Sequence, residues 1–343
     1  MLDRVKRQNE VFQLIINQYV DTASPVGSRV ISKKLGLSSA TIRNVMQDLE
    51  EIGLIMQPHA SAGRIPTEKG YRYYIDSLLR LKRLTEHQVD MIESEYWDRL
   101  KSLEELLERT SHILSLITNC AGIAILPKIR ERSFKHISFV PLAGRRVLVL
   151  LVTASGFVKD FVIESQTHIE KGELEKISNF LNSELYDMTL FEIKDCLTKR
   201  LKAERDAFYE MMKKAHDIMS LVLLHGLECD IFLEGTSHIL SQPEFKDYRK
   251  IYSVMRFLEN KDPIKDLLSE DIGQKGLTVH IGRENKALEL REFSIVTKEY
   301  LLKKKSLGRI GVIGLMRMDY KKVIPLVDFF ADRLTKALSE LDV

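Results

Sequence analysis

The chain has 343 residues, of which 44% are hydrophobic and 29% are charged, a composition that is ordinary for globular proteins and leaves room for two or three domains. Its longest purely apolar run, residues 147–152, is far too short to span a bilayer, and the N-terminus lacks the apolar core of a signal peptide. Three widely spaced cysteines indicate neither a disulfide framework nor a metal cluster. We therefore expect a cytoplasmic protein that has no membrane segment, metal or cofactor.

The net charge of +3 is unevenly distributed along the chain. Residues 1–83 contain 13 Lys and Arg against 8 Asp and Glu, whereas the remainder contains 39 basic and 41 acidic residues. A basic excess suits a surface that binds phosphate groups. An excess of this modest size also arises by chance, so the charge alone leaves both interpretations open.

The first 83 residues are predicted to begin with a helix-turn-helix. Apolar residues fall on one face of a first helix over residues 3–20, and a second helix ends at Gly36, where glycine adopts the left-handed cap conformation at little cost. Ser38 or Ser39 then supplies the oxygen that caps a third helix. Two helices separated by three residues that include a glycine are typical of this motif.

The third helix, which we expect to end near Glu51, has a polar face suited to reading bases. Its apolar stripe includes Ile42 and Leu49, and the opposite face holds small and hydrogen-bonding side chains. Asn and Gln can pair with adenine, Arg with guanine, and an Ala methyl can contact the methyl of thymine. A solvated face on an ordinary helical bundle is the simpler alternative, but the cap, turn, stripe and polar face agree with DNA recognition. In this helix the predicted DNA-binding residues are Ser39, Ala40, Thr41, Arg43, Asn44 and Gln47.

A hairpin is predicted directly after the third helix. Residues 54–56 begin a strand, Ile65 begins its return, and a turn-rich tip lies between them. A hairpin at this position is the wing of a winged helix-turn-helix. We predict that His59 and Arg64 reach the DNA backbone or the minor groove. Thr67 is expected to cap the helix that follows.

Four segments together resemble the HrcA family, the heat-inducible transcription repressors of bacteria. They occur in the family's order and extend over essentially the whole chain. One departure is that Leu315-Met316 stands where the family motif has Pro-Thr, before the Arg-Met-Asp-Tyr sequence that remains. The segments are GLIMQPHASAGRIPTEKGYRYYID (residues 53–76), FLEGTSHILSQPEF (232–245), HIGREN (280–285) and GRIGVIGLMRMDYKKVI (308–324).

The resemblance implies a function that composition and periodicity do not reach. HrcA proteins repress class I heat-shock operons, those of the DnaK system and of GroEL/GroES, through an inverted-repeat operator called CIRCE. The GroEL chaperonin supports their activity, and repression is relieved on heat shock. We therefore expect a homodimer that binds double-stranded DNA and is not an enzyme. Two alternatives remain: a ligand-controlled GAF-type repressor of other operons, and an enzyme with an appended DNA-binding head.

The family fold implies an α+β multidomain chain, in which a mainly helical dimerisation domain is inserted into a GAF-like domain. The residues agree with strands followed by a helical stretch and further strands. We expect a final amphipathic helix over residues 323–341. The predicted domains are a winged helix-turn-helix at 1–83, a helical linker at 84–119, a GAF-like domain at 120–185 and 246–343, and the inserted dimerisation domain at 186–245.

The sequence offers no catalytic constellation. Gly308, Gly311 and Gly314 lack the spacing of a dinucleotide-binding motif, and we expect them to serve packing within a strand. Glu284, Arg317 and Asp319 are candidates for a polar site in a GAF-type pocket. A structural network of salt bridges is the favoured interpretation of these residues.

Overall fold

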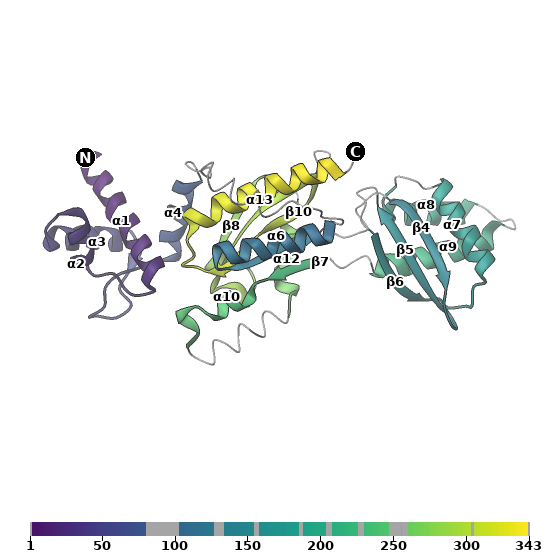
Figure 1. Cartoon of the computed structure of the whole chain (residues 1–343), viewed down its shortest axis with the longest axis horizontal. Coiled ribbons are helices and arrows are strands. Elements are labelled where there is room, and N and C mark those ends of the chain that lie inside the picture. Colours follow the sequence, from purple (N-terminus) through teal and green to yellow (C-terminus); the bar gives the residue numbers. More distant parts are fainter. Residues whose placement is uncertain are drawn as a thin grey trace.

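The computed structural model of the chain shows three units arranged along its long axis (Figure 1). An N-terminal helical head lies at one end, a five-stranded sheet with its helices lies in the middle, and a second, three-stranded sheet lies at the far end. The residues that the structure describes are 2–79, 103–126, 134–153, 158–184, 188–203, 208–225, 230–246, 255, 260–272, 274–302 and 305–341.

The head is the predicted winged helix-turn-helix. Gly36, at φ 68°, donates its backbone N–H to Ser32 and ends the second helix. Ser38 is the residue that caps the third helix, because its hydroxyl accepts the N–H of Thr41 at 3.1 Å. The head consists of α1 (Leu2–Thr22), α2 (Ser28–Leu35), α3 (Ser39–Glu51), β1 (Ile55–Met56), β2 (Ile65–Pro66) and α4 (Glu68–Leu78).

The wing is held against the start of α4. Strands β1 and β2 pair in antiparallel register, and the Thr67 hydroxyl accepts the N–H of Gly70 at 3.0 Å, as expected of a cap. A Cβ atom at Gly70 would lie 2.1 Å from the carbonyl oxygen of Leu54. The wing therefore approaches α4 this closely because residue 70 has no side chain.

The middle unit is built on an antiparallel sheet with the strand order β7-β3-β10-β9-β8. Three predicted packing glycines lie in β10. A Cβ at Gly308 would lie 2.1 Å from the carbonyl oxygen of Ile125, and one at Gly311 would lie 1.9 Å from that of Val296. The packing role of these glycines is thus confirmed. The strands are β3 (Ala121–Leu126), β7 (Asp230–Glu234), β8 (Leu277–Ile281), β9 (Phe293–Leu302) and β10 (Lys305–Leu315).

Helices cover both faces of this sheet. The long helices α6 (Leu103–Thr118) and α13 (Tyr320–Leu341) pack on one face, while α10 (Thr236–Leu240) and α12 (Asp262–Glu270) pack on the other. Successive residues of β3 accordingly belong to two apolar clusters, with Ala124 in the first and Ile125 in the second. The short 3-10 turns η2 (Pro243–Lys246), η3 (Gly282–Glu284) and η4 (Leu288–Leu290) border the second face.

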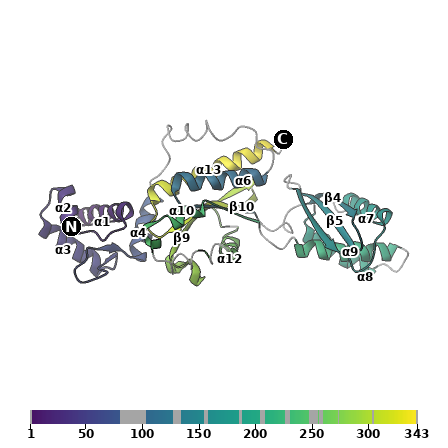
Figure 2. The ribbon, with the colours of Figure 1, turned by 60° about the horizontal axis from the view of Figure 1, so that its bottom comes forward.

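The third unit is a separate α+β layer pair at the end opposite to the head (Figures 1 and 2). Its sheet has the order β4-β5-β6, and from Val147 onward the residues of β5 alternate between buried and half-exposed positions. Helices cover one face of this sheet. The elements are β4 (Phe134–Pro141), β5 (Arg146–Thr153), β6 (Val158–Glu164), α7 (Lys171–Glu184), α8 (Leu190–Ala203) and α9 (Phe208–His225).

The strands of the two sheets do not follow the expected boundaries of the GAF-like and inserted domains. Strands β4 to β6, expected within the GAF-like segment 120–185, pair only with one another among the described residues. Strand β7, expected within the insertion 186–245, pairs with β3 in the middle sheet. Local periodicity indicates where strands lie but not which strands pair, and this accounts for the difference. Of the expected linker 84–119, residues up to 102 lie outside the described residues, and most of the rest is α6.

Candidate DNA-binding site

One face of α3, here called its recognition face, is open to solvent. Ala40, Arg43, Asn44 and Gln47 are all exposed, and their spacing of three and four residues places them on one side of the helix. The apolar residues between them, Ile42, Val45 and Met46, are buried in the core of the head. The structure therefore brings together four of the eight predicted DNA-binding residues on one open surface.

Ser39 and Thr41 lie at the N-terminus of the same helix and are half-buried. The Thr41 hydroxyl lies 2.8 Å from that of Ser38, so it contributes to the cap. The free N–H groups at this helix end favour a nearby phosphate. These two residues therefore lie at the cap of the helix and not on its exposed face.

Two basic residues of α1 lie next to the polar face of α3. A shallow pocket of about 510 Å³ lies where α1 meets α3, and Arg4 and Arg7 line it beside Asn44 and Gln47. Arg4 is tied to Asp48 at 2.9 Å, and this hydrogen bond lowers the pKa of the Asp48 carboxyl. The basic start of the chain was a signal for these residues, but only the fold shows that they lie next to α3.

The two predicted wing residues have different environments. His59 is exposed near the tip of the hairpin. Arg64 is half-buried, and its Nε donates to Oε2 of Glu50, in α3, at 2.8 Å. Its backbone also pairs with Val26, with both N–O distances at 2.9 Å. Arg64 thus anchors the base of the wing to α3 and to the loop before α2, a role that the sequence did not reveal.

Arg317 joins the head to the middle unit. Its guanidinium pairs with the Glu244 carboxylate, with one N–O distance of 2.9 Å, and donates to the side chain of Gln242 at 2.8 Å. A third nitrogen of the same group donates to the carbonyl oxygen of Val20, at the end of α1, at 3.0 Å. The predicted salt-bridge interpretation of Arg317 is confirmed. Asp319 is exposed at the start of α13.

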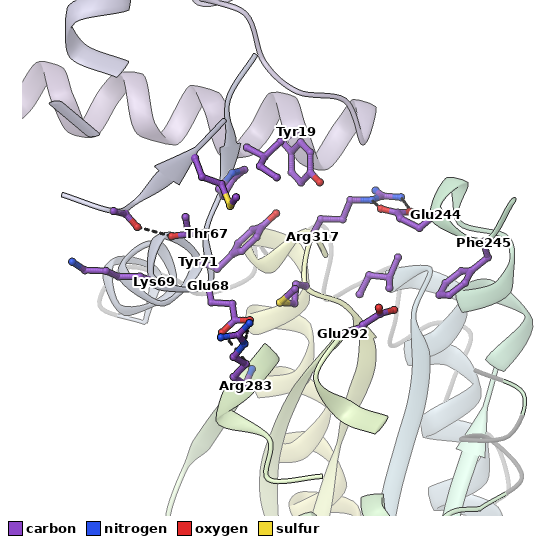
Figure 3. Close-up of a pocket in the computed structure, with 16 residues that line it drawn as sticks. Tyr19, Thr67, Glu68, Lys69, Tyr71, Glu244, Phe245, Arg283, Glu292 and Arg317 are labelled. Carbon is purple, nitrogen blue, oxygen red and sulfur yellow. Dashed lines mark hydrogen bonds and ion pairs between the residues drawn. The ribbon is translucent and has the colours of Figure 1, made fainter. Parts of the chain in front are cut away.

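The four family-like segments meet at this junction (Figure 3). Arg72 of α4 donates to Glu284, and Arg283 lies 3.8 Å from Glu68 of α4. Tyr71 packs its ring 5.9 Å from that of Tyr320. The sequence supplied the segments, but their convergence is visible only in three dimensions.

In the part of the chain that the structure describes, no group of three His, Cys, Asp or Glu side chains is arranged to hold a metal ion. The helices described there include none with the length and apolar character needed to cross a membrane.

Comparison with known proteins identifies the family. The family model described as "HrcA protein C terminal domain" matches residues 104–324, and "Winged helix-turn-helix transcription repressor, HrcA DNA-binding" matches residues 3–77. Proteins named heat-inducible transcription repressor HrcA from Syntrophobacter fumaroxidans and Geobacter sulfurreducens are 40% and 38% identical, over 99% and 98% of this chain and 99% of each relative.

One solved structure shares the fold of the chain. A crystal structure at 2.2 Å of a protein described as hypothetical superposes with a TM-score of 0.64, over 97% of this chain and 98% of the other, at 24% identity. This likeness extends over the whole chain and supports the α+β multidomain fold.

The exposed recognition helix, the adjacent wing and the family matches define a winged helix-turn-helix transcription repressor. More particularly, the chain belongs to the HrcA family, because both family models match and full-length relatives are nearly 40% identical. Membership of a repressor family confirms two predictions made from the sequence, that the chain is a DNA-binding repressor and that it is not an enzyme.

Proposed function

We propose that this protein represses class I heat-shock operons, those of the DnaK system and of GroEL/GroES, by binding a CIRCE inverted repeat in double-stranded DNA. The observation that carries the proposal is the open recognition face of α3 in a chain of this repressor family. Its curated relatives are named heat-inducible transcription repressors, which supports release of repression on heat shock. Because the operator is chromosomal DNA, we assign the protein to the cytoplasm.

We propose that base recognition rests on Ala40, Arg43, Asn44 and Gln47. Their side chains match the bidentate and methyl contacts that distinguish base pairs in the major groove. Ser39 and Thr41, at the start of the helix, would contact phosphate. His59 and Arg64 of the wing would contact the backbone or the minor groove.

We propose that the protein acts as a homodimer, because an inverted repeat matches two-fold protein symmetry. The face of the β4–β6 sheet that no described helix covers supports this, since three of its valines are exposed: Val140 by 40%, Val158 by 59% and Val162 by 43%. Exposing an apolar sheet face to water costs free energy. The same face of a second copy of the chain can cover it. We therefore assign the three-stranded unit, residues 134–225, as the inserted dimerisation domain, and the five-stranded unit as the GAF-like domain.

We further propose that GroEL supports the DNA-binding activity, as the family resemblance implies. The test is a titration of the protein on a CIRCE duplex and on a scrambled duplex, at one salt concentration, with and without GroEL. A preference of roughly a thousandfold or more for CIRCE is expected. Equal affinity for both duplexes under both conditions, with the protein folded, would contradict the operator assignment and favour the ligand-controlled alternative.

A further inference from the structure

A pocket of about 680 Å³ lies between the head and the middle unit (Figure 3). Pockets of a few hundred to about a thousand Å³ at domain interfaces are where small molecules usually bind. Met56 and Ile65 line this pocket from the wing, and Leu315 and Met316 line it from the body. These two residues stand where the family motif has Pro-Thr, and both are apolar here.

One buried polar group in the pocket wall lacks a partner. The Tyr71 side chain is only 3% exposed, and its hydroxyl makes no hydrogen bond to any described residue. Figure 3 shows this ring extending into the space between Tyr19 and Arg317. A buried hydroxyl without a partner costs free energy, so such groups usually meet a ligand or an ordered water. Burial raises the pKa of Tyr71, so the hydroxyl keeps its proton and is available as a donor.

The positive and negative charges that line the pocket balance each other. Arg317 is paired with Glu244, and Arg283 lies beside Glu68. The remaining two charged groups of the lining, Lys69 and Glu292, have opposite signs. A ligand with a net charge would therefore find no excess of opposite charge to offset its loss of hydration.

We propose that this pocket binds a small uncharged organic molecule, with an apolar body and one hydrogen-bond acceptor that receives the Tyr71 proton. The apolar body would lie between the wing residues Met56 and Ile65 and the body residues Leu315 and Met316. The proposal adds an effector site to the repressor and does not depend on which operator the protein binds.

Such a ligand would favour one orientation of the head. Its binding surface is divided between the wing and the body, so it is complete only while the two units stay in this arrangement. A ligand shifts a conformational equilibrium by its differential affinity for the two states. Occupancy of the pocket would therefore hold the recognition helices at a fixed angle to the body.

The test uses the full-length protein labelled with 13C at the methionine methyl groups, and benzamide as the probe. Met56 and Met316 report on the two walls, and their signals are assigned with Met56→Leu and Met316→Leu. Met219, buried in α9 of the three-stranded unit, is the internal control. Benzoate and benzylamine present the same ring with a negative and a positive charge. Binding of a probe this small is expected on the order of a millimolar.

Tyr71→Phe removes the hydroxyl and keeps the ring. The matched control is Tyr73→Phe in the same helix. It removes a hydroxyl that donates to the side chain of Asn9. We expect benzamide to shift the Met56 and Met316 signals but not that of Met219. Its affinity should fall roughly five- to tenfold in Tyr71→Phe and stay unchanged in Tyr73→Phe.

Three results would overturn the proposal. Absence of shifts at both methionines up to the solubility limit would mean that the pocket does not take such a ligand. Equal benzamide affinity in Tyr71→Phe and the wild type would show that the hydroxyl does not contact the ligand. Tighter binding of benzoate or benzylamine than of benzamide would exclude an uncharged ligand, and this comparison needs only the wild-type protein.

Discussion

Arg72, in the last helix of the head, is bound to Glu284, a residue 212 positions later in the chain. The Arg72 Nε donates to Oε1 of Glu284 at 2.8 Å, and a second guanidinium nitrogen donates to the Val279 carbonyl oxygen at 2.6 Å. Glu284 also accepts the backbone N–H of Ile281 at 3.0 Å, so its carboxylate is positioned by its own turn. The pair therefore fixes the end of the DNA-binding head to the edge of the middle sheet.

We expect Arg72 and Glu284 to be energetically coupled. Their side chains are 31% and 40% exposed, so solvent screening limits the coupling to about 0.5–1 kcal/mol. A double-mutant cycle with Arg72→Ala and Glu284→Ala, followed by denaturant unfolding, measures this coupling. The more exposed pair Lys286–Glu270, within the body, is the control and should give a smaller value. Strictly additive effects of the two substitutions would show that the contact contributes nothing.

Substitutions on the recognition face should change operator selectivity. Arg43→Ala and Asn44→Ala should each cost about 1–3 kcal/mol of binding free energy and relax discrimination at one base pair. Titrations on operator duplexes with single base changes measure both effects. The control is Asn9→Ala in α1, because this asparagine side chain faces Tyr73. Unchanged selectivity in both recognition-face variants would contradict the assignment.

Arg64 has two separable roles, and its partner Glu50 distinguishes them. Arg64→Ala should weaken binding to all DNA sequences and lower the slope of log affinity against log salt by about one, if the cation contacts phosphate. Glu50→Gln breaks the ion pair but keeps the cation, so binding should be kept or strengthened. Equal weakening by both variants would mean that Arg64 only anchors the wing.

Arg309 should be essential for the stability of the middle unit. Its side chain is fully buried, and its guanidinium donates to four carbonyl oxygens, of Asp271, Gln274, Gly276 and Thr297, at 2.8–3.3 Å. Arg309→Met would leave these acceptors unsatisfied in the interior, at a cost of about 3–5 kcal/mol. Denaturant unfolding measures the loss. Arg291→Met, at an exposed arginine, should change stability little.

Asp271 should make stability fall at acidic pH. Burial opposes ionisation, but hydrogen bonds from His280 at 2.8 Å and from Thr278 at 3.2 Å, with the nearby Arg309 charge, hold the pKa of Asp271 below its usual range. Its contribution is therefore fully present above the unfolded pKa of about 3.9 and is lost as pH falls through the lower folded value.

The measurement for Asp271 is the free energy of unfolding from pH 7 to pH 3. Asp271→Asn should flatten the acidic part of this curve. The exposed carboxylate of Asp262, at the start of α12, provides the control, and Asp262→Asn should keep the wild-type slope. A slope that Asp271→Asn leaves unchanged would assign the acid sensitivity to other groups.

Much of the head was predictable, because its determinants are local. The Gly36 cap, the Ser38 cap and the apolar stripe of α3 each act within a few residues, and the observed α3, Ser39–Glu51, ends where expected. The exposure of Arg43 and Asn44 follows from the same periodicity. The pairing of Arg64 with Glu50 was missed, since a wing side chain can reach either DNA or its own helix.

The sequence by itself determined the class of the protein, the winged helix and the four segments that place it in its family, because these depend on local propensity and motif order. Only the tertiary structure decided which strands share a sheet and how Arg72 and Arg317 join the head to the middle unit. It also showed that the buried Tyr71 hydroxyl, at the pocket between them, has no hydrogen-bond partner among the described residues. These relationships arise from contacts across hundreds of residues, and long-range pairing is selected by the packing of the whole chain rather than by the pattern of any one segment.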